Sequence, residues 1–196
     1  MGDLGPRPFR LGVALALLGL CFAAAAPSLD GAILGHDDEP LLLGPEGALE
    51  KPPLDFLTGL HYEAYLPVYG LTLRLDGALG AGPGDTFLLH FQNVLWHVAA
   101  SYLVFCLLAI LLGHRWAAVL GAILFALHPL HVESVAWISS RKDVVSGALL
   151  FLAWLLALRG EERHEGWTAA GAGVFLLACF AKASAVVLPA LLLAAA

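Results

Sequence analysis

The 196-residue sequence has little charge and few cysteines. Charged residues make up 13% of it and apolar residues 60%, a balance that excludes an ordinary soluble domain. Only 10 basic residues accompany 16 acidic ones, so the chain lacks the basic face of a nucleic-acid-binding protein. Cys21, Cys106 and Cys179 all lie in apolar runs, which predicts neither a disulfide framework nor a metal site. The composition is that of an integral membrane protein.

Apolar runs follow one another along the chain. A bilayer core about 30 Å thick takes about 20 helical residues to cross, so we expect spans at about 11–27, 87–113, 116–130, 144–159, 167–181 and 183–196. The first run also resembles a signal peptide, but the spans behind it favour an uncleaved helix. The predicted fold class is an all-α integral membrane, polytopic helical bundle, in one domain over 1–196. We expect this domain to be incomplete, because the last apolar run still continues at Ala196.

The placement of lysine and arginine predicts the orientation of the spans. If the spans alternate, one side carries Arg7, Arg10, Arg115, Arg159 and Arg163, and the other carries Lys51, Arg74, Arg141 and Lys142. We therefore expect a cytoplasmic amino terminus. The loop over about 28–86, the segment 128–143 and Lys182 then lie on the external side, which is periplasmic, extracellular or lumenal. Three polar clusters that are distant in sequence share one face of the membrane.

The long external loop begins with an acidic cluster, Asp37, Asp38 and Glu39, before Pro40. Adjacent carboxylates repel each other, so the pKa of one tends to rise and it can serve as a general base. A solvated acidic turn is the alternative. Residues 54–80 mix aromatic, apolar and a few charged residues, which predicts helices that lie in the membrane interface.

A polar stripe crosses the second expected span. His90, Asn93 and His97 are spaced i, i+3 and i+7, so they project from one face of a helix. Polar groups in a membrane normally face a bundle interior. Hydrogen bonding that fixes helix packing is one interpretation, and haem or metal ligation is the other, although no second histidine pair with matching spacing appears.

The segment HPLHVE carries His128, His131 and Glu133. It lacks the H-E-x-x-H spacing that places two metal ligands on one helical face, and Pro129 disturbs a helix at this point. We interpret Pro129 as the end of the third span and the start of an external segment, with a short helix over VESVAWISS.

Three cations follow on the same expected face. Arg141 and Lys142 are paired at the outer interface, which suits a phosphate or diphosphate, because arginine presents a planar fork and lysine a mobile point charge. Lys182 ends a short apolar run. It either snorkels to the interface or contacts a ligand anion.

Together these motifs resemble a known family. LLHFQNVLWHVAASYLVF followed by AILFALHPLHVESVAWISSRKDVVSGALLFLAWLLAL is similar to the membrane region of the transmembrane and tetratricopeptide-repeat O-mannosyltransferases and their bacterial relatives. DDEP resembles the acidic motif in the first external loop of lipid-linked sugar transferases, and AKASAVVLP resembles a segment in which a lysine faces the lipid phosphate. The resemblance covers most of the chain from about Ala32 and implies the amino-terminal part of a C-type glycosyltransferase fold.

The resemblance implies a membrane glycosyltransferase that moves a sugar such as mannose from a polyprenyl-phosphate donor in membrane lipid to a protein or other hydroxyl acceptor. It implies Asp37 or Asp38 as the general base. The implied substrate-binding residues are Glu39, His131, Glu133, Arg141, Lys142 and Lys182, and the structural polar residues are His90, Asn93, His97 and His128. No cofactor is required, although the acidic pair permits a divalent cation. The alternative is a non-catalytic scaffold or transporter fragment.

Overall fold

The computed structural model describes residues 4–35, 37–43, 47–60, 64–162 and 169–195. The regular elements in these ranges are all helices, and no strand forms in them. In chain order they are α1 (Arg7–Ala25), η1 (Ala26–Ser28), α2 (Asp38–Leu42), α3 (Asp55–Thr58), α4 (Pro67–Ala78), α5 (Phe87–Leu112), α6 (Arg115–Ala126), α7 (His131–Ala136), η2 (Ile138–Ser140), α8 (Arg141–Glu162), α9 (Ala169–Ala181), η3 (Ala183–Val187) and α10 (Leu188–Ala195).

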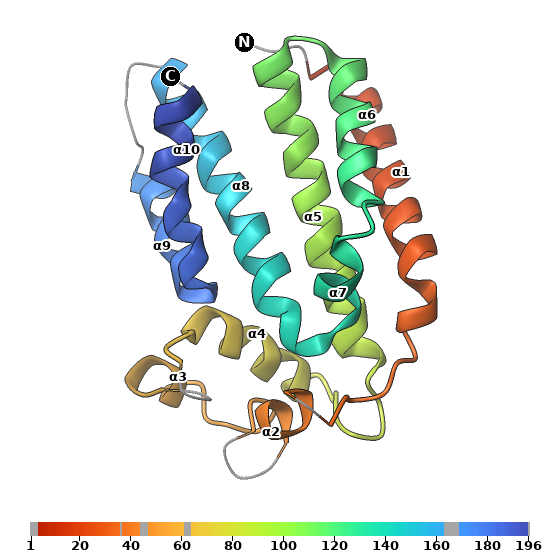
Figure 1. The fold of residues 1–196 in the computed structure, drawn as a ribbon, viewed down its shortest axis with the longest axis vertical. Coiled ribbons are helices and arrows are strands. Elements are labelled where there is room, and N and C mark those ends of the chain that lie inside the picture. The colour runs from red at the N-terminus through yellow and green to blue at the C-terminus, as the bar shows by residue number, and fades with distance from the viewer. Residues whose placement is uncertain (1–3, 36, 44–46, 61–63, 163–168, 196) are drawn as a thin grey trace.

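The long helices form an upright bundle, with α2, α3 and α4 gathered across one of its ends (Figure 1). Helix α5 is central and contacts α1, α6, α7 and α8, while α9 packs on α8. Three helical segments are long and apolar enough to cross a membrane: Arg7–Ser28, Phe87–Leu112 and Ile138–Gly160. The predicted all-α membrane bundle is therefore confirmed.

Local sequence explains the tight connection between α5 and α6. Helix α5 ends at Leu112, and Gly113 follows it with a φ of 63°, a left-handed conformation that favours glycine. The His114 side chain then caps α6 by accepting a hydrogen bond of 3.2 Å from the Ala117 amide. Further along, a Cβ at Gly121 would lie 2.5 Å from Leu108 Cδ1. Gly121 thus allows the two helices to approach closely.

Two helices differ from the expected spans at their ends. Helix α6 stops at Ala126, four residues before the expected end of the third span, because Pro129 lacks the amide proton that a continuing helix needs. The chain resumes as the short helix α7. Helix α8 starts at Arg141, three residues before the expected Val144, and so the cations expected in an external segment lie in its first turn.

The loop that was expected to carry interfacial helices has its own small core. Leu41, Phe56, Leu73 and Ile138 are among its buried members. Gly77 packs closely against the segment that connects α2 to α3. A Cβ at Gly77 would come within 2.1 Å of the Leu49 carbonyl oxygen. The loop is therefore packed against the bundle end through η2 and α5.

The expected polar clusters meet at that same end of the bundle. Figure 1 shows α2 and α4 beside the start of α8 and the connection from α9 to α10, with the described amino-terminal and carboxy-terminal residues at the opposite end. Beyond Lys182 the expected sixth span begins as the 3-10 segment η3 and continues as α10.

Candidate functional site

The two adjacent aspartates of the acidic cluster have different surroundings. Asp38 is 1% exposed, and its carboxylate accepts hydrogen bonds from the Ser139 amide at 2.8 Å and from the Ser139 hydroxyl. The Leu34 amide donates to its other oxygen at 3.2 Å. Asp37 is half-buried, and no described residue donates a hydrogen bond to its carboxylate. Asp38 therefore holds the loop, while Asp37 keeps its oxygen atoms available.

The Ser139 turn is also held from the other side. The Tyr69 hydroxyl of α4 donates to the Ser139 carbonyl at 3.1 Å. Burial raises the pKa of Tyr69, and the nearby Arg141 charge opposes that rise. Both Asp37 and Asp38 also act on the Tyr69 hydroxyl electrostatically. The acidic cluster, α4 and the segment before α8 therefore form one assembly. Glu39, beside it, is exposed.

Arg141 lies inside the protein rather than at a surface. Its side chain is 0% exposed and forms an ion pair with Asp76 of α4, which is also 0% exposed. Its Nε donates to Asn93 Oδ1 at 2.7 Å. The two Nη atoms donate to the Leu89 carbonyl at 2.6 Å and the Thr72 carbonyl at 3.3 Å. Every nitrogen of the guanidinium is bonded to the protein, so the geometry does not present Arg141 to a phosphate.

Asp76 was not among the residues expected from the sequence, although it anchors this network. It also accepts a hydrogen bond from the Gln92 side chain. Burial raises the pKa of Asp76, and the Arg141 charge and the hydrogen bonds from Arg141 and Gln92 oppose that rise. The sequence contained a signal for the burial of Asp76, namely helical spacing. Tyr69, Leu73 and Asp76 are spaced i, i+4 and i+7 and form the buried face of α4.

The remaining cations lie at the edge of the bundle end. Lys182 forms an ion pair with Asp143, and the two side chains are 35% and 32% exposed. Lys142 is half-buried, and no described residue accepts a hydrogen bond from it. Close by, Tyr65 and Phe180 pack edge to face with their ring centroids 5.9 Å apart. The structure thus brings Lys182 to the start of α8.

The histidine and asparagine stripe of α5 is buried and hydrogen-bonded, consistent with helix packing. His90 Nε2 lies 3.0 Å from the Gly31 carbonyl oxygen, and His97 Nε2 lies 2.9 Å from that of Ala126. The Asn93 amide donates to the carbonyls of Val135 and Trp137 at 3.3 Å and 3.1 Å. The stripe therefore joins α5 to the loop that precedes it, to α6 and to the end of α7.

The HPLHVE residues lie apart from the acidic cluster. Glu133 and His128 are exposed, and His131 is half-buried. The ring centroids of His131 and His97 are 5.2 Å apart. No group of three or more His, Cys, Asp and Glu side chains among the described residues is arranged to hold a metal ion.

Known proteins are similar to this chain. The human protein O-mannosyl-transferase TMTC2 is 35% identical over 115 residues, which cover 59% of the chain and 13% of that protein. The Drosophila melanogaster Tmtc2 protein of the same name is 32% identical over 120 residues, again 59% of the chain and 13% of the relative. The human TMTC4 protein is 28% identical over 173 residues, 75% of the chain and 23% of that protein.

The similarity covers a small part of each relative, since the aligned chain spans 13% of the length of the first two. No protein-family model matches the chain, and no solved structure is significantly similar to it. These relatives are named protein O-mannosyl-transferases, and they confirm the resemblance of this chain to the transmembrane and tetratricopeptide-repeat O-mannosyltransferases.

Proposed function

We propose that this chain is part of a membrane glycosyltransferase that transfers a sugar, mannose by preference, from a polyprenyl-phosphate donor to a protein hydroxyl on the external side of the membrane. The proposal is supported by the names of relatives that are 28–35% identical and by the acidic cluster at one end of the bundle. It concerns the whole protein, because this chain spans a small share of those relatives.

Asp37 is the general base in this proposal. Its carboxylate takes the proton of the acceptor hydroxyl as that oxygen attacks the anomeric carbon. The bond from the anomeric carbon to the donor phosphate breaks, and its electron pair leaves with the polyprenyl phosphate. A single displacement of this kind inverts the anomeric centre. Asp38 does not serve as the base, because Ser139 and Leu34 already occupy its oxygen atoms.

Lys142 and Lys182 stabilise the leaving phosphate in this proposal. Fixed cations stabilise charge that develops during a reaction more than water does. Lys182 exchanges its Asp143 partner for the phosphate when the donor enters. Arg141 holds α4 and α5 against the start of α8 and contacts no substrate.

The remaining expected residues have supporting roles. Glu39 is exposed beside the base and contacts the acceptor. His131 and Glu133 lie on α7 and orient the segment that leads to Ser139. No step requires a metal ion, since the two lysines supply the positive charge.

The hydrogen bonds from Ser139 to Asp38 carry the proposal, because they join residues 101 positions apart. They hold the acidic cluster beside the helix that begins with Arg141 and Lys142. These hydrogen bonds thus hold together two separate segments of the chain, one with the acidic cluster and one with the cations.

The test is sugar transfer from defined polyprenyl-phosphate donors by the full-length protein that contains this chain. Asp37→Asn should reduce transfer at least 1000-fold, on the order of losing a general base together with its charge, with unfolding unchanged. Asp38→Asn should retain measurable transfer, because an amide oxygen can still accept from Ser139. The matched control is Asp55→Asn, in an exposed part of the same loop. Full transfer by Asp37→Asn would refute the assignment of the base.

A non-catalytic scaffold is the second candidate, and the buried network around Arg141 favours it, since such networks can fix helix packing. A scaffold predicts no donor turnover in any variant, the unmodified protein included. Turnover that Asp37→Asn abolishes would eliminate this candidate.

A further inference from the structure

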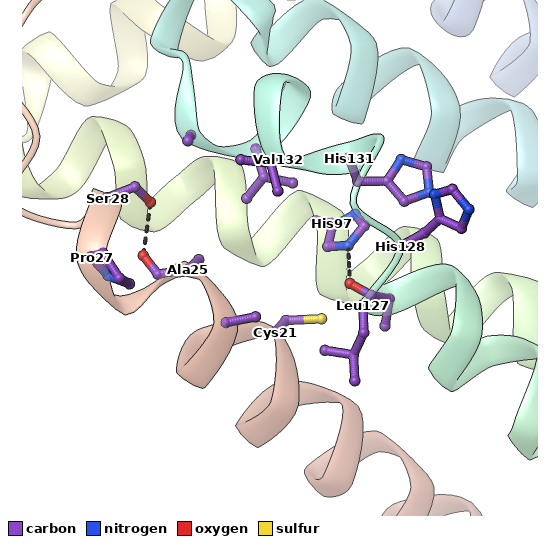
Figure 2. Close-up of a pocket in the computed structure, with 13 residues that line it drawn as sticks. Cys21, Ala25, Pro27, Ser28, His97, Leu127, His128, His131 and Val132 are labelled. Carbon is purple, nitrogen blue, oxygen red and sulfur yellow. Dashed lines mark hydrogen bonds between the residues drawn. The ribbon is translucent and has the colours of Figure 1, made fainter.

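A cavity of about 350 Å³ opens between α1, α5, α6 and α7. None of the residues proposed for base catalysis or phosphate stabilisation lines it. Figure 2 shows the rings of His97, His128 and His131 gathered at the cavity, near Cys21 and Val132. The rest of its wall is mostly apolar.

The cavity lies where a membrane helix is interrupted. Helix α6 has 12 residues, about 18 Å at 1.5 Å per residue, whereas a bilayer core is about 30 Å thick. It begins directly after the end of α5 and runs back beside it. Residues 127–130 therefore turn within the depth of the membrane. Irregular backbone is tolerated at such depth only when protein covers it or when it lines a polar cavity.

Some hydrogen-bonding groups of this turn have partners in the protein, and others have none among the described residues. His97 Nε2 binds the Ala126 carbonyl at 2.9 Å, which supplies a partner that the interrupted helix lacks. His128 Nδ1 accepts a hydrogen bond of 3.3 Å from the Leu130 amide, so its Nε2–H remains as a donor. No described residue hydrogen-bonds to the His131 ring, whose centroid lies 6.0 Å from that of His128.

The charges around the cavity select the kind of ligand. Its 13 lining residues include three histidines but no Asp, Glu, Lys or Arg. Two imidazole rings with free donors, and with no carboxylate beside them, suit a group that has several acceptor oxygens and a negative charge. The apolar wall, with Pro27, Val132 and Val135, suits a hydrocarbon chain.

We propose that this cavity binds the phosphate head of a membrane lipid, with His128 and His131 donating hydrogen bonds to the phosphate oxygens and the lipid chain lying against α1 and α7. We expect the phosphate to reach the cavity as the head group of a lipid, because most of the cavity wall is apolar. This site goes beyond the proposed sugar transfer and does not rest on it.

The test uses the protein in a maltoside detergent, which carries no phosphate. The probe is phosphatidic acid with a photoactivatable diazirine in one acyl chain, and the matched probe is diacylglycerol with the same chains. We expect phosphatidic acid to label residues 24–28 and 132–136 about tenfold more than diacylglycerol does, since two charge-assisted hydrogen bonds distinguish them. Mass spectrometry of the labelled peptides locates the sites.

Variants distinguish labelling by lipid bound in the cavity from labelling by lipid that contacts the protein surface. His128→Phe with His131→Phe should reduce phosphatidic acid labelling to the level of diacylglycerol, because the rings lose their donors and keep their bulk. His114→Asn is the control, since it lies outside the cavity and Asn retains an acceptor for the α6 cap. If the double variant unfolds, Ala24→Trp instead fills the cavity from α1 and should abolish labelling at 132–136.

Four outcomes overturn the proposal. Equal labelling by the two probes would mean that phosphate is not recognised. Unchanged labelling in the folded double variant, or labels only outside the lining, would remove the histidines from the site. Competition by inorganic phosphate as effective as that by unlabelled phosphatidic acid would assign the site to a free anion. No sugar donor is present in the experiment, so failure of the proposed transferase function leaves its result unaffected.

Discussion

Arg141 and Lys142 are neighbours in sequence but lie in opposite environments. Arg141 is 0% exposed and is bonded through all its nitrogens to α4 and α5, whereas Lys142 is half-buried and has no hydrogen-bond partner among the described residues. Successive helical residues point about 100° apart, so the two neighbouring side chains leave the helix in different directions. Charge type alone therefore does not tell a structural cation from one that is available to a ligand.

Asp37 and Asp38 repeat the same division. Asp38 is buried against Ser139, and Asp37 beside it has no described donor. In each doublet one charged residue secures the end of the bundle, and the other has no hydrogen-bond partner among the described residues. The pairs thus differ in what their loss should do: stability should fall for the held member, and function for the free one.

The largest stability effect is expected at Arg141. Arg141→Met leaves Asp76 buried without its partner, so the free energy of unfolding should fall by about 3–5 kcal/mol. Denaturant or thermal unfolding in detergent measures this loss. Adding Asp76→Asn should recover much of it, because removing both charges eliminates the unpaired one. A single variant as stable as the parent would show that the ion pair does not hold α4.

Asp38→Ala should have the next largest effect on stability. It leaves the buried Ser139 amide and hydroxyl without an acceptor, which costs about 2 kcal/mol. Asp38→Asn should cost less, since its oxygen can still accept. Asp37→Ala is the matched control and should change the free energy of unfolding by about 0.5 kcal/mol or less. Equal losses at the two positions would contradict the division of the acidic doublet.

The Lys182–Asp143 pair should contribute less than about 1 kcal/mol, because both side chains are about a third exposed. Lys182→Gln should nevertheless lower sugar transfer at least tenfold, on the order of one lost charge-assisted contact to the phosphate. Asp143→Asn frees the lysine and should spare transfer. A parallel loss of stability and transfer in Lys182→Gln would make the pair structural.

Lys142→Gln should have the smallest effect on stability, within about 0.5 kcal/mol. Its effect should appear as a fall of about fivefold in kcat, with KM for the lipid-linked donor less affected, because it removes a charge that stabilises the leaving phosphate as its negative charge develops. Steady-state kinetics of the full-length protein separates the two constants. An unchanged kcat would leave Lys182 as the cation that stabilises the leaving phosphate.

Much of the architecture followed from one-dimensional patterns. Apolar runs between charges predicted the helical bundle, and the i, i+3, i+7 spacing of His90, Asn93 and His97 predicted a stripe on one helical face, which the structure shows to be buried. Pro129 marked an interruption near the correct place. These inferences succeed because backbone hydrogen bonding in lipid is local to a helix, so composition and spacing are sufficient.

The partners of the charged residues did not follow from such patterns. Ser139 carried no motif, and the helical spacing of Asp76 did not indicate its partner, yet these two residues hold Asp38 and Arg141 across 101 and 65 positions. Whether a charged group is buried depends on which donor or acceptor from a distant part of the chain reaches it. The spacing of residues along one helix does not show which distant segment packs against that helix.

The sequence by itself determined that this protein is an all-helical membrane bundle, and it indicated that three polar clusters belong to one end. Only the tertiary structure decided which member of each charged doublet is held and which is free, and that an interrupted helix encloses a histidine-lined cavity. The reason is physical: helix formation depends on neighbours in the chain, whereas the burial of a charge depends on how helices from distant parts of the sequence pack together.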